Sequence, residues 1–298
     1  MNGADEKRID GKTIARRIEE EAAETVRRLR ESGTEPRLVS VAVDEEDASF
    51  ASYLRSREQA CLRVGIRSDV VVVPAADPTR SLGGALEKLS ADRTVHAILL
   101  KLPLPPGADE AAIFARIDPA KDVEGLHPLN AGLLASGRPR FVPCTALAVA
   151  EILAVESPSL AGKDVVILGR SRVVGSPLAV LLLRKGTDAT VTVCHSRTRD
   201  LAGHARRADV LVAAVGRPEM VTGEWIRPGA IVIDVGTHAI EDPSAKKGWR
   251  LAGDVRFESA EPACSRITPV PGGVGPVTTA VLLRAAASAA ASAAGGDR

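Results

Sequence analysis

The sequence predicts an α/β protein made of two α/β domains. Its length of 298 residues is typical of two domains rather than one. Apolar runs of strand length alternate with amphipathic helical patterns, and this alternation favours parallel sheets. One strand–glycine turn–helix–strand unit, from Val165 to Cys194, has about the length of a βαβ crossover.

Composition excludes several classes of protein. Hydrophobic residues make up 45% of the chain and aromatic residues 2%, so two cores would be packed from Val, Leu, Ile and Ala. A net charge of +1 gives no electrostatic argument for binding nucleic acid or a membrane surface. No apolar run reaches about 18 residues, and the first ten residues are too polar for a secretory signal.

The cysteines and histidines show no metal-ligand spacing. The four cysteines lie far apart without a C-x-x-C pair, and the five histidines follow no ligand pattern. We therefore expect reduced thiols, no metal site and a cytoplasmic protein.

In the first part of the chain, helices and strands are predicted to alternate. Helices are expected at Ile9–Arg30, Ala48–Val64 and Ser81–Leu89, and strands at Leu38–Val43, Val70–Val73 and Val95–Leu100. The first helix carries Ile14, Ile18 and Ala22 on one face. Gly65 closes the second helix as a C-terminal glycine.

The second part of the chain continues the alternation. A helix over Thr145–Val155 is expected to lead into the second domain. Strands are expected at Val165–Leu168, Ala189–Cys194, Val210–Val215 and Ala230–Val235, with a helix at Leu178–Leu183. Ile267–Pro276 has too many glycines and prolines for any regular element, and Thr278–Ala294 predicts a final helix.

The segment Lys163–Pro177, KDVVILGRSRVVGSP, indicates a dinucleotide site. A strand, a glycine turn and a helix in this order place backbone N–H groups and a helix N-terminus under a phosphate. The spacing is not G-x-G-x-x-G, because Ser171 and Val174 stand where glycines would be. An ordinary glycine turn before a core helix is the alternative.

The end of the next strand favours NADP over NAD. An acidic residue that binds ribose is expected there, but the chain has His195-Ser196-Arg197-Thr198 instead. A hydroxyl and a guanidinium suit a 2′-phosphate, since arginine forks onto phosphate oxygens. The second domain is therefore predicted to be Rossmann-like and to bind NADP.

Three side chains in the first part are candidates for a ligand site. Tyr53 and Arg57 are four residues apart on one predicted helix and share a face, although a surface pair would look the same. Lys101 directly follows a predicted strand, and ligands of parallel sheets bind beyond the carboxyl ends of strands. Any strand can also end on a solvated lysine.

Two loops add further candidates. Asp122 and Glu124 flank Val123, although two acids in a loop are usually solvated. Gly272–Pro276, GGVGP, allows a ligand to approach the backbone closely, and a tight interdomain turn is the alternative.

Together these motifs resemble a known family. KLPLP, KDVEGLHPLN, PCT at Pro143–Thr145, ILGRSRVVGSP, TVCHSRT, VIDVG and ITPVPGGVGP occur in the family's order. The chain resembles the bifunctional methylenetetrahydrofolate dehydrogenase/methenyltetrahydrofolate cyclohydrolases of one-carbon metabolism, which are oxidoreductases and hydrolases. The resemblance implies a cytoplasmic homodimer with NADP on the second domain and folate in the cleft between domains. We expect residues 1–142 with 277–298 to form the folate domain and 143–276 the NADP domain.

The resemblance also implies roles for individual residues. Tyr53 would stack on the folate, and Pro271, Gly272 and Gly273 would line its pocket. The residues implied to contact NADP are Gly169, Arg170, Ser171, Ser196, Arg197 and Thr237. The catalytic positions correspond to Arg57, Lys101 and Glu124.

The chain departs from the family pattern at those three catalytic positions. Lysine of Y-V-x-x-K-x-K becomes Arg57, glutamine of Q-L-P-L-P becomes Lys101, and the second aspartate of D-V-D-G becomes Glu124. The segment Asp44–Ser52 also departs from G-x-D-P-A-S. Hydride transfer needs mainly positioning, whereas hydrolysis needs a group that titrates, which arginine does not. We therefore expect NADP-dependent oxidation of methylenetetrahydrofolate with weak or absent cyclohydrolase activity.

Three alternatives stay open. Lys101, beside the like charge of Arg57, could take over proton transfer as a neutral amine. The chain could be a specialised paralogue acting on a different substrate. It could also be a non-catalytic folate-binding or regulatory protein, against which the intact NADP motifs argue.

Overall fold

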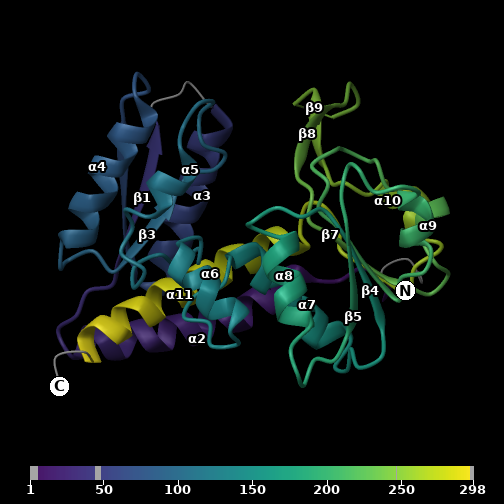
Figure 1. Cartoon of the computed structure of the whole chain (residues 1–298), viewed down its shortest axis with the longest axis horizontal. Helices are drawn as coiled ribbons and strands as arrows, with labels where there is room; N and C mark the ends of the chain where they lie inside the picture. Colours follow the sequence, from purple (N-terminus) through teal and green to yellow (C-terminus); the bar gives the residue numbers. More distant parts are fainter. Residues whose placement is uncertain (1–5, 44–47, 246, 296–298) are drawn as a thin grey trace. The chain divides into compact units, whose positions relative to one another are not determined.

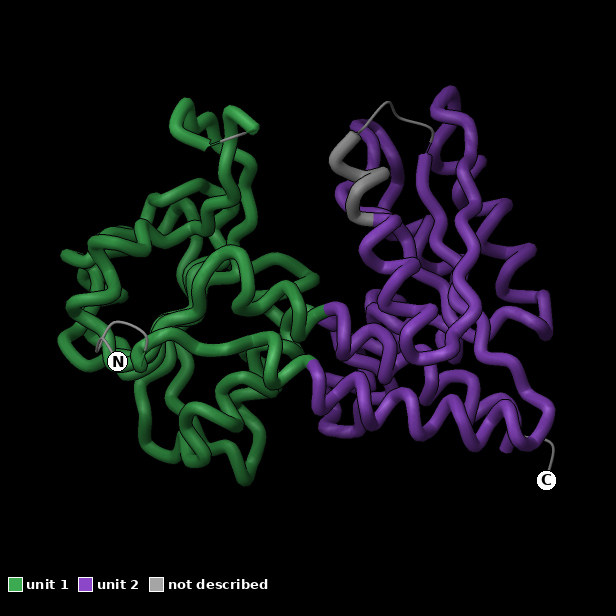
Figure 2. The backbone as a smooth tube through the Cα atoms, turned by 180° about the vertical axis from the view of Figure 1, so that it is seen from behind, with its two compact units in different colours: residues 1–15, 145–278 green, residues 16–144, 279–298 purple. Residues whose placement is uncertain are grey.

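The computed structural model describes residues 6–43, 48–245 and 247–295, with the backbone alone for residues 48–53. The chain divides into two compact units, which Figure 2 shows in separate colours. Unit 1 comprises Met1–Ala15 and Thr145–Thr278, and unit 2 comprises Arg16–Cys144 and Thr279–Arg298. Each unit contains its own parallel sheet, as the alternating pattern predicts.

Unit 2 has a three-stranded parallel sheet in the order β2-β1-β3. Its strands are β1 (Arg37–Val43), β2 (Arg67–Val73) and β3 (Ala97–Leu100). Val41 pairs with Val71 on one side and with Leu100 on the other. Helices α3 (Ala48–Val64) and α4 (Pro78–Ala91) pack against this sheet (Figure 1). The carboxyl ends of the three strands therefore meet at one edge.

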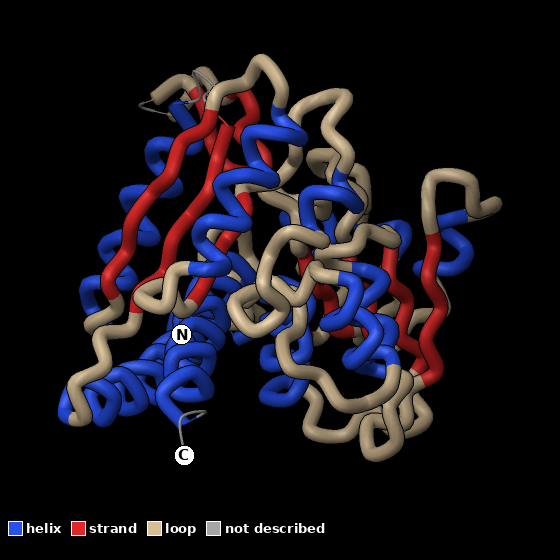
Figure 3. The backbone as a smooth tube through the Cα atoms, turned by 60° about the vertical axis from the view of Figure 1, so that its left-hand side comes forward, coloured by secondary structure: helices blue, strands red, loops and turns tan. Residues whose placement is uncertain are grey.

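Unit 1 has a five-stranded parallel sheet in the order β10-β7-β6-β4-β5. Figure 3 colours the strands of both units red and the helices blue. Its strands are β4 (Asp164–Leu168), β5 (Thr190–Cys194), β6 (Val210–Ala213), β7 (Ile231–Asp234) and β10 (Arg266–Ile267). Its helices include α7 (Cys144–Glu156), α8 (Gly175–Leu182), α9 (Leu201–Ala205), η1 (Gly223–Trp225) and α10 (Phe257–Ala260). Leu168, Leu211 and Val232 lie in a core of small and branched aliphatic side chains.

The structure differs from the sequence prediction at the glycine-proline segment. The prediction that Ile267–Pro276 contains no regular element is wrong, because a strand ends at its first residue and a helix begins before its last. Arg266–Ile267 forms β10 because it pairs in parallel with β7. Helix α11 (Val274–Gly295) begins within the same segment.

Several short elements were not predicted. An antiparallel hairpin joins β8 (His238–Glu241) to β9 (Trp249–Ala252). Helices α5 (Glu110–Phe114) and α6 (Pro128–Ala135) lie in the loop-rich part of unit 2. Elements of four to eight residues carry too little periodicity to be recognised from sequence alone.

The amino-terminal segment belongs to unit 1, whereas the sequence prediction placed it in the folate domain. The backbone N–H of Ile9 donates to the Ile267 carbonyl at 2.9 Å, and that of Ile267 donates to the Lys7 carbonyl at 2.8 Å. These bonds attach the segment to β10. Helix α2 (Gly11–Glu31) then carries the chain into unit 2.

Helix α11 is long and apolar enough to span a membrane by length and composition, but half of its apolar stretch is buried inside the protein. Val281, Leu283, Ala286 and Ala290 are almost completely buried. This burial is that of a core helix.

Candidate active site

The carboxyl edge of the sheet in unit 1 has a topological switch point between β4 and β6. From β4 the chain passes to β5 on one side and returns to β6 on the other. Ligands of open α/β sheets bind in the crevice at such a point. Gly169 follows β4 with a φ of 125°, and a Cβ there would clash with the Ala214 carbonyl after β6. The two loops that border the crevice are therefore in direct contact.

The glycine turn is closed by its own side chains. A Cβ at Gly175 would clash with the Gly169 carbonyl, so both glycines are required by close backbone approach. The Ser171 hydroxyl accepts the Val174 N–H at 3.2 Å, and the Ser176 hydroxyl donates to the Arg170 carbonyl at 3.0 Å. The turn leads into the N-terminus of α8, which is suited to an anion. This narrow backbone cradle fits the pyrophosphate of a dinucleotide.

The segment after β5 lies at the same edge. The Gly169 N–H donates to the Cys194 carbonyl at 2.8 Å, which joins this segment to the glycine turn. The His195 N–H donates to the Thr198 hydroxyl at 2.9 Å, and the Arg197 N–H to His195 Nδ1 at 3.2 Å. The side chains of the predicted 2′-phosphate site, Ser196 and Arg197, are exposed. Their backbone is thus held in a tight turn while the side chains remain accessible.

In unit 2, the structure places Arg57 close enough to Glu124 to influence its carboxyl. Arg57 lies on α3 and is 3% exposed. Its charge acts on the carboxyl of Glu124. Lys101 follows β3 at the carboxyl edge, where its backbone N–H donates to the Val41 carbonyl at 2.8 Å. All three residues belong to unit 2.

Structural interactions at both ends of the loop Lys121–Gly125 fix the position of Glu124. The Lys121 ammonium donates to the carbonyls of Ser90 and Asp92 at 2.7 Å each. The buried Asp122 carboxylate accepts the His127 N–H and the Asn130 amide, both at 2.8 Å. A Cβ at Gly125 (φ 64°) would lie 2.8 Å from the Phe141 carbonyl. Asp122 is therefore a structural residue and not a solvated loop acid.

The Glu124 carboxyl lies in a desolvated environment. Burial raises its pKa above the ordinary value and the Asp122 charge adds to this, whereas the Cys144 thiol and Arg57 act in the opposite direction. Burial, followed by the Glu124 charge, raises the pKa of the Cys144 thiol. The thiol also donates to the Val123 carbonyl at 3.5 Å. Glu124 is thus a carboxyl that can hold a proton at a higher pH than a solvated one.

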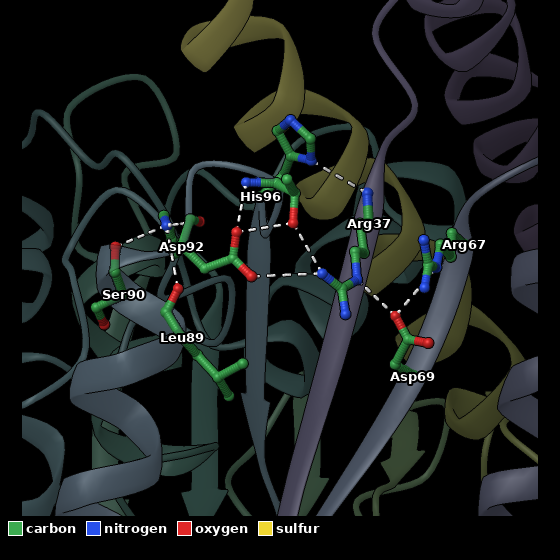
Figure 4. A network of polar contacts seen from close by, with 9 residues as sticks. Arg37, Arg67, Asp69, Leu89, Ser90, Asp92 and His96 are labelled. Atoms are coloured by element: carbon green, nitrogen blue, oxygen red, sulfur yellow. Dashed lines mark hydrogen bonds and ion pairs between the residues drawn. The ribbon is translucent and has the colours of Figure 1, made fainter.

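Figure 4 shows a polar network at the amino-terminal edge of the three-stranded sheet of unit 2, opposite the carboxyl edge that Lys101 follows. Arg37 pairs with Asp69 at 2.6 Å and with Asp92 at 3.5 Å, and its backbone N–H donates to His96 Nδ1 at 3.2 Å. Burial, aided by the Lys121 and Arg37 charges, lowers the pKa of His96. Because ligands of parallel sheets bind at the carboxyl edge, we assign this network to structure.

The predicted folate contacts fall in two places. The side chain of Tyr53 lies outside the described part of the chain, as do residues 44–47 and the side chains of residues 48–52. Pro271–Gly273 lies in unit 1, where Gly272 has a φ of 110° and a Cβ at Gly11 would clash with the Gly273 carbonyl. Pro271 also lines a cavity of about 270 Å³ that includes Arg8 and Arg250.

Two buried carboxylates in unit 1 escaped the sequence analysis. Asp234, at the end of β7, accepts the N–H groups of Gly236, Asp254 and Val255 at 2.8–3.0 Å. Burial raises its pKa to about 7. Asp254 is fully buried. An acid among the last residues of a predicted strand, as in VIDVG, was the available signal for Asp234, whereas Asp254 follows a hairpin that was not predicted.

The same folds and motifs occur together in known proteins. Residues 9–124 match the catalytic domain of tetrahydrofolate dehydrogenase/cyclohydrolase, and residues 143–294 match its NAD(P)-binding domain. This chain belongs to that family. It is 49% identical over 286 residues to "Bifunctional protein FolD 3" of Rhizorhabdus wittichii, covering 95% of this chain and 92% of the relative. It is 45% identical over 276 residues to "Bifunctional protein FolD 1" of Myxococcus xanthus, covering 92% and 94%.

Solved structures of the family have the same fold. The Trypanosoma brucei methylenetetrahydrofolate dehydrogenase-cyclohydrolase, in complex with NADP and an inhibitor, has a TM-score of 0.88 at 41% identity, covering 95% of this chain and 97% of that one. The bifunctional enzyme of Campylobacter jejuni has a TM-score of 0.87 at 37% identity, covering 95% and 98%. The resemblance and the two-domain α/β fold class are confirmed. The expectation of a weak or absent cyclohydrolase activity is not borne out, because these relatives are named as bifunctional.

Proposed function

We propose that this chain oxidises 5,10-methylenetetrahydrofolate with NADP and then hydrolyses the 5,10-methenyl product. The observation that carries the proposal is the backbone cradle of Gly169 and Gly175 beside Ser196 and Arg197, in a chain of this family. NADP supplies the hydride acceptor when bound. The carbon that loses the hydride becomes a cation stabilised by its two nitrogen neighbours, so no proton moves in this step.

The residues of unit 1 bind and orient the cofactor. The glycine turn and the N-terminus of α8 would hold the pyrophosphate. Arg170 and Ser171 border this turn, Ser196 and Arg197 would bind the 2′-phosphate, and Thr237 would contact the cofactor at the end of β7. NADP is preferred over NAD because Arg197, after β5, attracts the 2′-phosphate. A carboxylate in place of Arg197 would repel that phosphate.

Hydrolysis requires a group that exchanges protons. Water adds to the cationic carbon and loses one proton, which is released; the remaining hydroxyl loses its proton as the carbon–nitrogen bond breaks and the formyl C=O forms, and the nitrogen that leaves takes up one proton. A guanidinium is not a proton-transfer group, so we assign Arg57 no part in this exchange. Burial raises the pKa of the Glu124 carboxyl above its ordinary value, and a perturbed carboxyl of this kind is a candidate for proton transfer. We assign proton transfer to Glu124, with Arg57 and Lys101 orienting the folate.

Around this chemistry, Tyr53 would stack on the folate and Pro271–Gly273 would line its pocket. By the same family resemblance we propose a homodimer that works in the cytoplasm. A second candidate function is oxidation of a different, related substrate, which is favoured by the joint change at Arg57, Lys101 and Glu124.

The test is an assay of the purified chain with methylenetetrahydrofolate and NADP. We expect NADPH and the hydrolysed formyl product to form together, and NAD to support a lower rate. If NADP is not reduced with this folate but is reduced with another substrate, the second candidate function holds. Light scattering at micromolar concentration tests the dimer.

A further inference from the structure

The side chain of Asp254 binds three consecutive backbone amides. It is 0% exposed and lies between β9 and α10. Its Oδ2 accepts the N–H groups of Val215 at 2.6 Å and Gly216 at 3.1 Å, and its Oδ1 accepts that of Arg217 at 3.0 Å. One carboxylate therefore determines the conformation of the whole turn that follows β6.

His238 completes the set of donors. Its Nε2 lies 2.8 Å from Asp254 Oδ1. Because the carboxylate can only accept, Nε2 carries the proton and donates it. His238 is the first residue of β8 and follows Thr237, a predicted NADP contact. Asp254 thus joins the turn after β6 to the segment after β7.

The segment that carries Asp254 is itself fixed. The backbone N–H of Asp254 donates to Asp234 Oδ1 at 2.8 Å, and the same oxygen accepts the Gly236 N–H at 3.0 Å. A Cβ at Gly236 would clash with the backbone nitrogen of Asp254. The two carboxylates therefore connect the ends of β6 and β7 through a continuous chain of hydrogen bonds.

This connection lies beside the switch point. Ala214, which immediately precedes the turn, is the residue whose carbonyl abuts Gly169. Taking a carboxylate out of water is unfavourable unless donors replace the lost hydration. Here four donors surround Asp254, and three of them belong to one turn at the edge where ligands bind. The hydrogen bonds of the buried Asp254 side chain therefore order the turn Val215–Arg217, which forms one wall of the crevice.

We propose that Asp254, together with His238, is a positioning residue for NADP, which holds the turn Val215–Arg217 and the Thr237 segment in the binding conformation. This inference rests on the proposed use of NADP. It assigns no contact between Asp254 and the cofactor. The two residues act by reducing the freedom of the crevice wall before the cofactor arrives.

The first experiment compares His238→Leu, which removes the donor, with His238→Gln, whose amide can still donate. Loss of one hydrogen bond to a charged group predicts a Kd for NADP raised roughly tenfold in His238→Leu. The Kd should return to within about twofold of wild type in His238→Gln, and the KM for the folate should not change. His204→Leu, on α9, is the matched control and should bind NADP as wild type does.

The second experiment measures amide hydrogen exchange of the peptide covering Val215–Arg217, in the full chain without substrate. Exchange should be faster in His238→Leu and in Asp254→Asn, and NADP should slow it again. Equal exchange and equal Kd for NADP in wild type and His238→Leu would overturn the proposal. The proposal would also be overturned if His238→Leu raised the KM for NADP and the KM for the folate equally and lowered the melting temperature, and if His238→Gln did not restore either KM.

The two proposals fail in different ways. If wild type binds NADP but does not oxidise methylenetetrahydrofolate, the proposed function fails while the Kd comparison still decides the role of Asp254. If wild type turns over normally and the variants bind NADP normally, the positioning proposal alone fails.

Discussion

The cofactor side of unit 1 and the catalytic side of unit 2 differ in what their chemistry depends on. In unit 1 the essential groups belong to the backbone: glycines in close contact, a helix N-terminus, and amides fixed by buried carboxylates. In unit 2 the proposed chemistry depends on a few charged side chains, Arg57, Lys101 and Glu124, and these are the positions at which the chain departs from the family pattern. A backbone site can be recognised from spacing, whereas a side-chain site can change its chemistry without changing the fold.

The largest effect is expected where the backbone of unit 1 is most constrained. In Gly169→Ala the new Cβ clashes with the Ala214 carbonyl at a φ of 125°. We expect a loss of about 3–5 kcal/mol in the free energy of unfolding, or complete loss of NADP binding. Gly186→Ala is the control, because its φ is 91° with no atom within 4 Å, and should cost only about 1 kcal/mol. Chemical denaturation measures the stability of the two variants, and NADP titration measures their cofactor binding. Equal effects of Gly169→Ala and Gly186→Ala would contradict the close contact between Gly169 and the Ala214 carbonyl.

The second prediction separates the two activities in unit 2. Glu124→Gln keeps the shape of the side chain but cannot exchange protons. Cyclohydrolase activity should fall by about 100-fold or more, while the dehydrogenase rate changes much less. Glu87→Gln, at an exposed residue paired with Arg116, is the control and should leave both activities unchanged. A parallel loss of both activities would assign Glu124 to folate binding instead.

The third prediction concerns the buried carboxyl of Asp234. Its pKa is raised from 3.8 to about 7, so the native state binds the proton more tightly than the unfolded chain. The stability that this proton provides is present at low pH and is lost as pH rises toward 7. Between about pH 5.5 and 7, the contribution should fall by roughly 2 kcal/mol. The contribution of Asp234 is isolated by the difference in unfolding free energy between wild type and Asp234→Asn, because His96 and the other titrating groups are present in both proteins. If this difference did not change with pH, the raised pKa of Asp234 would be contradicted.

The smallest effect is expected at the exposed 2′-phosphate site. In Arg197→Ala the Kd for NADP should rise about tenfold, or about 1.4 kcal/mol, with the Kd for NAD unchanged. Arg199→Ala, two residues along and also exposed, should change neither. Equal weakening of NADP and NAD by Arg197→Ala would show that this arginine does not select the 2′-phosphate.

The sequence was most informative where local patterns are long or sterically constrained. The strands and longer helices follow from apolar runs, and the glycine turn follows from the order of strand, turn and helix in Lys163–Pro177. The hairpin β8–β9 could not be predicted, because its four-residue strands are too short to show a periodic pattern. The roles of Asp254 and His238 could not be predicted, because they depend on hydrogen bonds between residues that are 16 to 39 positions apart. The structural role of Asp122 could not be predicted for a different reason: its partners His127 and Asn130 come within hydrogen-bond distance only once the start of α6 has formed.

One measurement tests the central claim that this chain is a bifunctional enzyme despite Arg57, Lys101 and Glu124. The chain is mixed with methylenetetrahydrofolate and NADP, and NADPH, the methenyl intermediate and the formyl product are followed in the same reaction. We predict that the formyl product keeps pace with NADPH in wild type and that the methenyl intermediate accumulates in Glu124→Gln. Accumulation of the methenyl intermediate in wild type, with hydrolysis no faster than without the protein, would contradict the account.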